Sequence, residues 1–99
     1  MKRSEVVARP KSTEPALRAL SVDGLYLFGS HARDEARADS DVDLFVEKSP
    51  GRRFGLHELM GSYRVLRDAL PDAELGFGTR EGLPRSIALD VEREAIRIF

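Results

Sequence analysis

LYLFGSHARDEARADSDVDLFVE, residues 25–47 of the chain, is the stretch that decides the predicted fold. Its first four residues are apolar and end at Gly29, which is typical of a short buried strand. A polar loop follows, and a second apolar run begins at Val42 and carries Asp43 inside it. Two strands joined by a loop are therefore expected here, and the remaining segments can be interpreted as support for this pair.

The corner at the end of the first strand is Gly29-Ser30. Glycine allows the backbone to turn sharply and to approach a ligand closely, while serine supplies a hydroxyl and an amide donor. If a helix opened at this corner, its free N–H groups and its dipole would suit a phosphate group. By itself the pair is also consistent with an ordinary turn, so its interpretation depends on the residues downstream.

Asp41 and Asp43 lie two positions apart at the start of the second apolar run. Because side chains alternate along a strand, both carboxylates point to the same side, about 6.6 Å apart along it. Adjacent carboxylates repel each other unless water or a cation neutralises them, and Mg²⁺ prefers oxygen ligands and leaves room for phosphates. Asp41 alone would fit a solvated turn. Asp43 lies inside an apolar run, where a charge needs a reason.

Two segments, GSHAR at residues 29–33 and SDVDL at residues 40–44, together resemble a known signature. A Gly-Ser corner, a spacer of about this length and an acidic-x-acidic strand characterise the DNA polymerase beta-like nucleotidyltransferases. The chain is most similar to their small branch, the minimal nucleotidyltransferases, and the resemblance extends over nearly its whole length. It implies an α+β fold, with a small mixed β-sheet backed by helices on one face.

The resemblance implies transfer of a nucleoside monophosphate, AMP from ATP, to a hydroxyl group. In that reaction Asp41 and Asp43 would ligate two Mg²⁺ ions, and Gly29 and Ser30 would bind the departing phosphates. Arg33 stands where the family pattern has arginine, so it is a candidate phosphate ligand. A structural ion pair between Arg33 and a neighbouring acid fits its position nearly as well.

A third carboxylate, which relatives place on a later strand to ligate metal and assist deprotonation, has no clear counterpart. The expected third strand is AELGFG at residues 73–78, and an ungapped match puts the acid at Gly76. Glu74 lies two residues earlier, about 6.6 Å away on the same face. A bulge or register shift in the Gly-x-Gly segment would bring Glu74 into the site as a third metal ligand. Otherwise Glu74 is a surface charge on an edge strand and the third ligand is lost.

The resemblance also implies a protein acceptor. Minimal nucleotidyltransferases often accompany a separate HEPN-domain protein as the antitoxin of a toxin–antitoxin pair, and some adenylylate a tyrosine of that toxin. The alternative is a degenerate antitoxin or interaction module that acts by binding alone, which Gly76 favours. A small-molecule-modifying enzyme is disfavoured because no second domain is present to bind a small acceptor.

Other segments predict supporting elements. A helix is expected after Ser12 or Thr13, whereas Pro10 is expected to interrupt any helix before it. A long helix is expected to end at Pro71, because apolar residues recur at helical spacing: Leu56, Leu59, Met60, Tyr63, Leu66 and Leu70. Tyr63 is expected to pack in the core. Pro84 should open a last helix, and residues 95–99 alternate like a terminal edge strand.

Composition sets the remaining expectations. Ninety-nine residues suggest one minimal nucleotidyltransferase domain, residues 1–99, with residues 1–11 allowed to be flexible. The net charge of −1 argues against tight binding of nucleic acid through phosphate neutralisation. With no cysteine, disulfides and thiolate metal sites are excluded. No signal peptide or membrane-spanning run is recognised, so a cytoplasmic location is expected.

Overall fold

Four strands form one mixed sheet in the computed structural model, which describes residues 2–37 and 39–99. In chain order the strands are β1 (Val22–Phe28), β2 (Val42–Lys48), β3 (Leu75–Thr79) and β4 (Ile96–Arg97). The helices are α1 (Arg3–Lys11), α2 (Glu14–Ala19), α3 (Leu56–Ala69) and α4 (Arg85–Glu94), with a short 3₁₀ turn, η1 (Arg80–Gly82).

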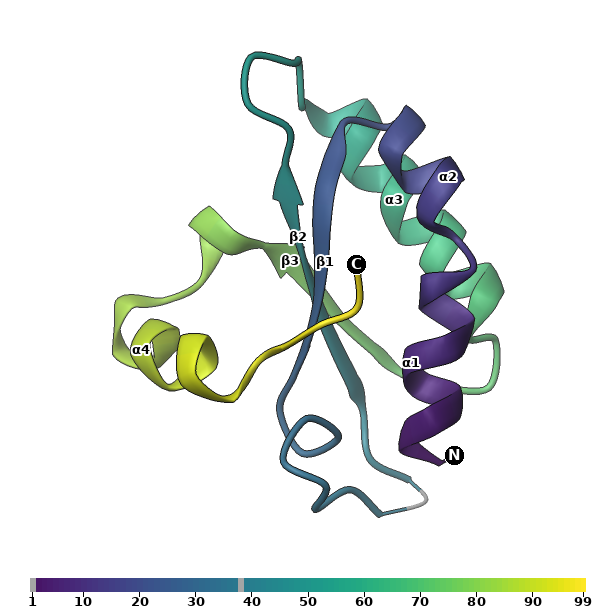
Figure 1. Ribbon diagram of the computed structural model, residues 1–99, viewed down its shortest axis with the longest axis vertical. Coiled ribbons are helices and arrows are strands. Elements are labelled where there is room, and N and C mark those ends of the chain that lie inside the picture. The colour runs from purple at the N-terminus through teal and green to yellow at the C-terminus, as the bar shows by residue number, and fades with distance from the viewer. Residues whose placement is uncertain (1, 38) are drawn as a thin grey trace.

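The spatial order of the strands is β3-β2-β1-β4. β1 runs antiparallel to β2 and to β4, whereas β2 and β3 are parallel and are joined through α3. The helices α1, α2 and α3 lie on one side of the sheet, and α4 lies on the other side (Figure 1). The predicted α+β architecture and the terminal edge strand are therefore confirmed. The expectation that the helices back only one face of the sheet is wrong, because α4 lies on the opposite face.

The core lies between the sheet and α1, α2 and α3. Alternate residues of the two central strands are fully or almost fully buried on this face: Leu25, Leu27, Val42, Leu44 and Val46. From the helices, Leu17 and Leu66 complete the same cluster with no exposed surface. Burial of this apolar area is the main contribution that fixes the two strands in register.

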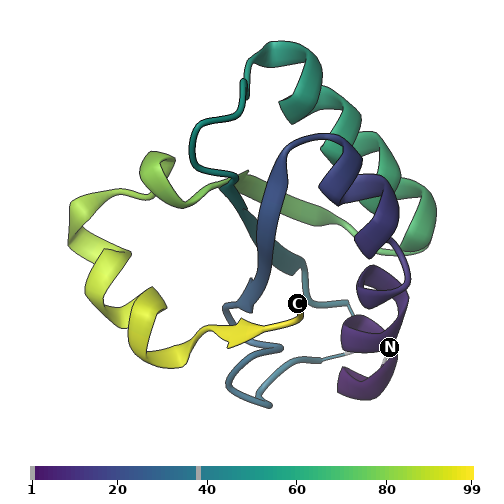
Figure 2. The same ribbon diagram turned by 45° about the horizontal axis from the view of Figure 1, so that its top comes forward.

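The opposite face of the two central strands carries Asp43 and an aromatic pair. Tyr26 and Phe45 are directly opposed across β1 and β2, and their rings stack with centroids 4.9 Å apart. Phe28 packs on Phe45 at 5.3 Å. A turned view places α4 beside this part of the sheet, away from the three other helices (Figure 2). We refer to this face as the open face.

Two expectations about local structure need correction. The interruption expected at Pro10 is wrong, because α1 includes Pro10 in its last turn. Proline removes one N–H donor there, but its buried ring packs against the domain and offsets that loss. Tyr63 is 40% exposed and not a full core residue, although its ring contacts Phe77 at 5.7 Å. The expected long helix and its end before Pro71 are confirmed.

No helix in residues 2–37 and 39–99 combines the length and the apolar character that crossing a membrane requires.

Candidate active site

The Gly-Ser corner lies at the point where β1 leaves the sheet. Gly29 has a φ of 76°, a left-handed conformation that favours glycine, and the chain then makes a single helical turn. In this turn the amide of Arg33 donates to the Gly29 carbonyl at 3.2 Å, and the amide of Glu35 donates to Ser30 at 2.9 Å. Asp34 follows with a φ of 59°, a left-handed conformation that glycine adopts more readily than aspartate.

Asp43 lies directly beside this corner. It is opposite Phe28 in the antiparallel ladder and opposite Gly76 in the parallel one. A Cβ atom on Gly29 would lie 3.2 Å from Cγ of Asp43 and would overlap Oδ2. A Cβ atom on Gly76 would lie 3.3 Å from the same Cγ and would overlap Oδ1. The carboxylate is therefore held between two glycines, and each of them makes room for one oxygen.

Burial raises the pKa of Asp43, and the charge of Asp41 raises it further. The positive charges of His31 and Arg33 lower the pKa of Asp43, but by less. The two aspartates thus concentrate negative charge. The nearby positive charges do not fully offset the cost of ionising the half-buried Asp43. One divalent cation fits this donor set, because Mg²⁺ binds through one or two carboxylates plus the phosphates of its substrate.

Arg33 forms its ion pairs with acids other than Asp41 and Asp43. Its guanidinium lies 3.1 Å from Glu94, at the end of α4, and 3.3 Å from Glu35. Hydrogen bonds to these two carboxylates raise the pKa of Arg33. The structural ion pair considered from the sequence is therefore present. A role for Arg33 in phosphate binding stays a prediction, and it requires exchange of a glutamate for a phosphate.

Glu74 lies just before β3, where its carbonyl accepts a hydrogen bond of 2.8 Å from the amide of Val42. Its exposed side chain lines a cavity of about 330 Å³ together with charged residues from α1 and from the loop before β2. Within residues 2–37 and 39–99 the structure forms no metal-binding group of three or more acidic or histidine side chains. The structure therefore does not bring Glu74 together with Asp41 and Asp43, and its role as third ligand stays a prediction.

Two features of the site were not foreseen from the sequence. His31 is only 3% exposed, and its charge lowers the pKa of Asp43, although the sequence assigned it no part. Gly76 was expected only as a gap in the acidic set, whereas the structure shows it as space for Asp43 Oδ1. The available signals were the position of His31 immediately after Ser30 and the spacing of the glycines in β3.

A family model described as a nucleotidyltransferase domain matches residues 11–96. The chain belongs to this nucleotidyltransferase family. A solved structure described as a minimal nucleotidyltransferase is 30% identical and superposes with a TM-score of 0.78, over 97% of this chain and 95% of that chain. The resemblance read from the two sequence segments is thereby confirmed, and the chain is placed in the transferase class. Members of this family generally use a nucleoside triphosphate and a divalent metal ion.

Two solved toxin–antitoxin structures share the fold of this nucleotidyltransferase. One, described as a toxin–antitoxin with AMP-PNP, is 17% identical with a TM-score of 0.66, over 90% of this chain and 72% of that chain. The other, a mutant of the toxin–antitoxin MntA-HpeT, is 15% identical with a TM-score of 0.64, over 90% and 71%. No curated protein sequence matches the chain.

Proposed function

We propose that this nucleotidyltransferase moves AMP from ATP to a hydroxyl group on a partner protein. The observation that carries the proposal is the place of Asp43, whose carboxylate is held between Gly29 and Gly76 and is destabilised by Asp41. An ionised carboxylate in this position lowers the free energy of unfolding. A functional role for Asp43 explains why the residue is there despite this cost.

Asp41 and Asp43 are the residues that would hold Mg²⁺. Bound there, the ion would reduce the repulsion between the two carboxylates and offset part of the charge of the triphosphate. The backbone at Gly29 lies beside Asp43. There the Ser30 hydroxyl and the N–H groups of the corner would donate hydrogen bonds to the departing pyrophosphate. The acceptor oxygen would form a bond to the α-phosphorus as the bond to pyrophosphate breaks.

Glu74 is the proposed acceptor of the proton that the attacking hydroxyl loses, and the proposed third ligand for a second Mg²⁺. To serve in either role, the segment before β3 must move, because Gly76 and not Glu74 is paired with Asp43. If Glu74 is not used, the proton passes to solvent and the site holds one ion through two carboxylates.

The proposed partner is a HEPN-domain toxin in the cytoplasm, with this nucleotidyltransferase as the antitoxin that adenylylates it. Support comes from the shared fold with two toxin–antitoxin structures, one of which is described with an ATP analogue.

A second function, inhibition of a partner by binding alone, is favoured by one observation. Gly76 lies beside Asp43 at the position where the third carboxylate was expected, and it carries no side chain. The same experiment separates the two functions.

The test uses ATP labelled at the α-phosphate, Mg²⁺, the purified protein and the product of the adjacent gene. We expect label on that partner, and loss of about 10³-fold or more in rate for Asp43→Asn. Glu74→Ala should lower the rate if Glu74 takes the proton and leave it unchanged otherwise. A folded wild-type protein that binds the partner without labelling it would contradict transfer and support inhibition by binding.

A further inference from the structure

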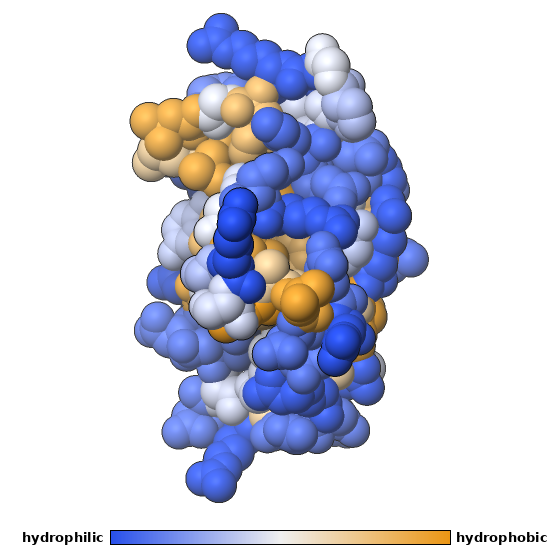
Figure 3. All heavy atoms as spheres, turned by 90° about the vertical axis from the view of Figure 1, so that its left-hand side faces the viewer, coloured by the Kyte–Doolittle hydropathy of each residue, from blue (hydrophilic) through white to orange (hydrophobic). Residues whose placement is uncertain are grey.

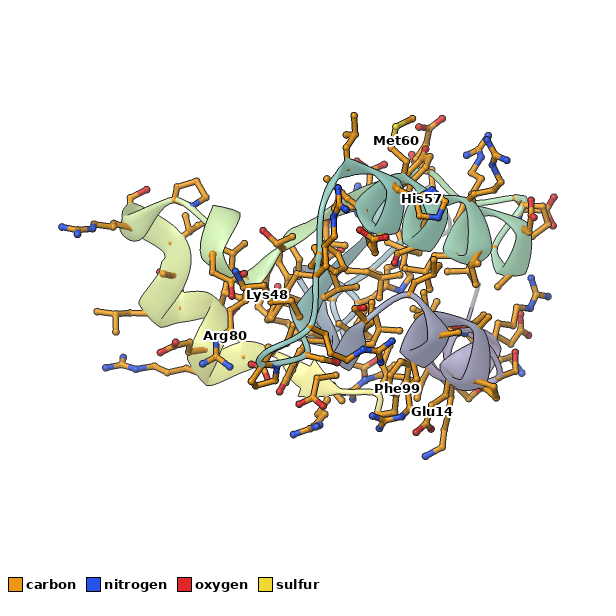
Figure 4. The ribbon with its side chains drawn as sticks, turned by 90° about the horizontal axis from the view of Figure 1, so that it is seen from above. Glu14, Lys48, His57, Met60, Arg80 and Phe99 are labelled. Atoms are coloured by element: carbon orange, nitrogen blue, oxygen red, sulfur yellow. The ribbon has the colours of Figure 1, made fainter. Side chains whose placement is uncertain are left out.

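Three large apolar side chains form a row on the outer surface of α3. Leu56, Met60 and Tyr63 are 70%, 59% and 40% exposed, and their spacing places them on one line along the helix. We call these three residues the apolar stripe. Hydrophobic atoms gather near the end of the molecule where α3 begins (Figure 3). Seen from above, Met60 projects from α3 away from the sheet (Figure 4).

The surface beside the apolar stripe is hollowed, and one end of the stripe contacts the edge of the sheet. Leu56 and Met60 border a hollow of about 420 Å³ that is completed by His57, Gly61 and Arg64. At the other end, the Tyr63 ring meets Phe77 of β3, an edge strand. The hollow lies wholly on α3. An exposed apolar helix surface with such a hollow can receive one face of another helix, with an apolar residue in the hollow.

Three arginines lie on or just before α3, whose own acids are Glu58 and Asp68. Arg53 precedes α3, and Arg64 and Arg67 lie on its exposed surface. None of the three forms an ion pair in the part of the chain that the structure describes, whereas Arg18 and Arg80 pair with glutamates. Two copies of the chain facing each other across this surface would bring arginines together, which disfavours a symmetric dimer.

We propose that the apolar stripe binds an amphipathic helix of a partner protein, with apolar residues on Leu56, Met60 and Tyr63 and acidic residues against the arginines. The identity of this partner with the acceptor rests on the proposed function. Because α3 covers the core face of the sheet and Asp43 lies on the open face, a helix docked on α3 leaves the active site free. Partner binding and nucleotidyl transfer would then use separate surfaces of one small domain.

The experiment measures binding of two designed 18-residue helical peptides by fluorescence anisotropy, without nucleotide. Both carry leucines along one face, and their flanks carry either glutamate or lysine. We expect the glutamate peptide to bind at least about tenfold more tightly than the lysine peptide. Met60→Glu should weaken its binding by about tenfold or more. Leu89→Glu on α4 is the matched control, since Leu89 is 68% exposed outside the stripe, and it should bind like the wild type.

Each other outcome overturns the proposal. Equal or reversed affinity for the two peptides would contradict a role for the arginines in binding. No binding at millimolar concentration would show that the stripe is not a docking surface for such a helix. A wild-type dimer in light scattering that Met60→Glu dissociates would assign the stripe to a second copy of the chain. Binding without nucleotide is independent of catalysis, so loss of label transfer in Asp43→Asn leaves this result unaffected.

Discussion

Gly29 combines two demands that can be separated by experiment. Its φ of 76° disfavours a side chain, and a Cβ atom there would also overlap the Asp43 carboxylate. Gly51 has almost the same φ, 75°, but a Cβ atom there would meet nothing within 4 Å. We expect Gly51→Ala to cost about 1 kcal/mol of unfolding free energy, from backbone strain alone. Gly29→Ala should cost about 1–3 kcal/mol more, because Asp43 must move.

Urea denaturation of the two alanine variants measures this difference. Equal losses of unfolding free energy at Gly29 and Gly51 would show that the Asp43 carboxylate does not occupy the space above Gly29.

Asp43 also makes stability depend on pH in a defined direction. Since burial and Asp41 raise its pKa, the folded state binds a proton more readily than the unfolded state. The ionised carboxylate therefore costs stability at pH 7, and this cost disappears as pH falls through the pKa of Asp43. We expect Asp43→Asn to melt a few degrees higher than the wild type at pH 7 without Mg²⁺, a gain of about 1 kcal/mol or less because solvent screens a half-exposed site.

Thermal unfolding at pH 7 and near pH 4 checks this expectation, with the advantage of the asparagine variant shrinking at the lower pH. Adding Mg²⁺ and an ATP analogue should raise the melting temperature of the wild type alone. An asparagine variant that is less stable at pH 7 would mean that Asp43 makes structural bonds.

At the residue scale, the sequence was informative where neighbours in sequence are neighbours in space. The two apolar runs predicted the neighbouring strands that bring Asp43 beside Gly29, whereas Asp41 lies just before β2 and not within the strand. The pairing of Arg33 with Glu94 joins residues 61 positions apart, and no local pattern contains that distance. Parallel pairing of Gly76 with Asp43 depends equally on how α3 returns the chain to the sheet.

At the scale of elements, α4 is attached mainly through charge. Val91 is its only residue classed as buried in the described chain, while Arg80 bridges Glu47 of β2 and Glu92 of α4 at 2.7 and 3.0 Å. Glu94 adds a contact of 3.1 Å to Arg33. Because added salt screens exposed charges, α4 should open more easily as ionic strength rises.

Hydrogen exchange tests this attachment. Raising NaCl from about 0.05 to about 0.5 M shortens the Debye length several-fold, so amides of α4 should exchange several-fold faster. Amides of α3, which buries Leu66 completely, should change little. The same salt response in both helices would contradict an electrostatic attachment.

The helix α3 shows why a correct element does not settle its burial. Six apolar residues at helical spacing predicted the helix, but they span a wide arc of its circumference. Only part of that arc meets the sheet and α2, so Leu66 and Leu70 are buried while Leu56 and Met60 remain exposed. The spacing of apolar residues predicts that a helix forms. The width of the surface offered by the sheet and α2 decides how much of the apolar side of that helix is buried.

At the scale of the whole molecule, the sheet separates stability from chemistry. One face packs on α1, α2 and α3 and holds the core, and the open face presents Asp43 beside the Gly29 corner. The fold class followed from the family resemblance of two short segments, and the predicted order of strands and helices is compatible with it. For the site, the place of Asp43 beside the Gly29 corner agrees with the sequence, while the roles of Asp41, Asp43 and a third carboxylate stay predictions.

The central claim is that a metal–nucleotide complex binds at Asp41 and Asp43 beside the Gly29-Ser30 corner. The most direct measurement is an NMR titration of the ¹⁵N-labelled protein with AMP-PNP and a small amount of Mn²⁺, whose unpaired electrons broaden nearby amide signals. We expect selective loss of signals from Gly29, Ser30, Asp43 and Gly76, and no loss in Asp43→Asn. An unchanged spectrum, or broadening centred away from Asp43, for example at the start of α3, would contradict the account.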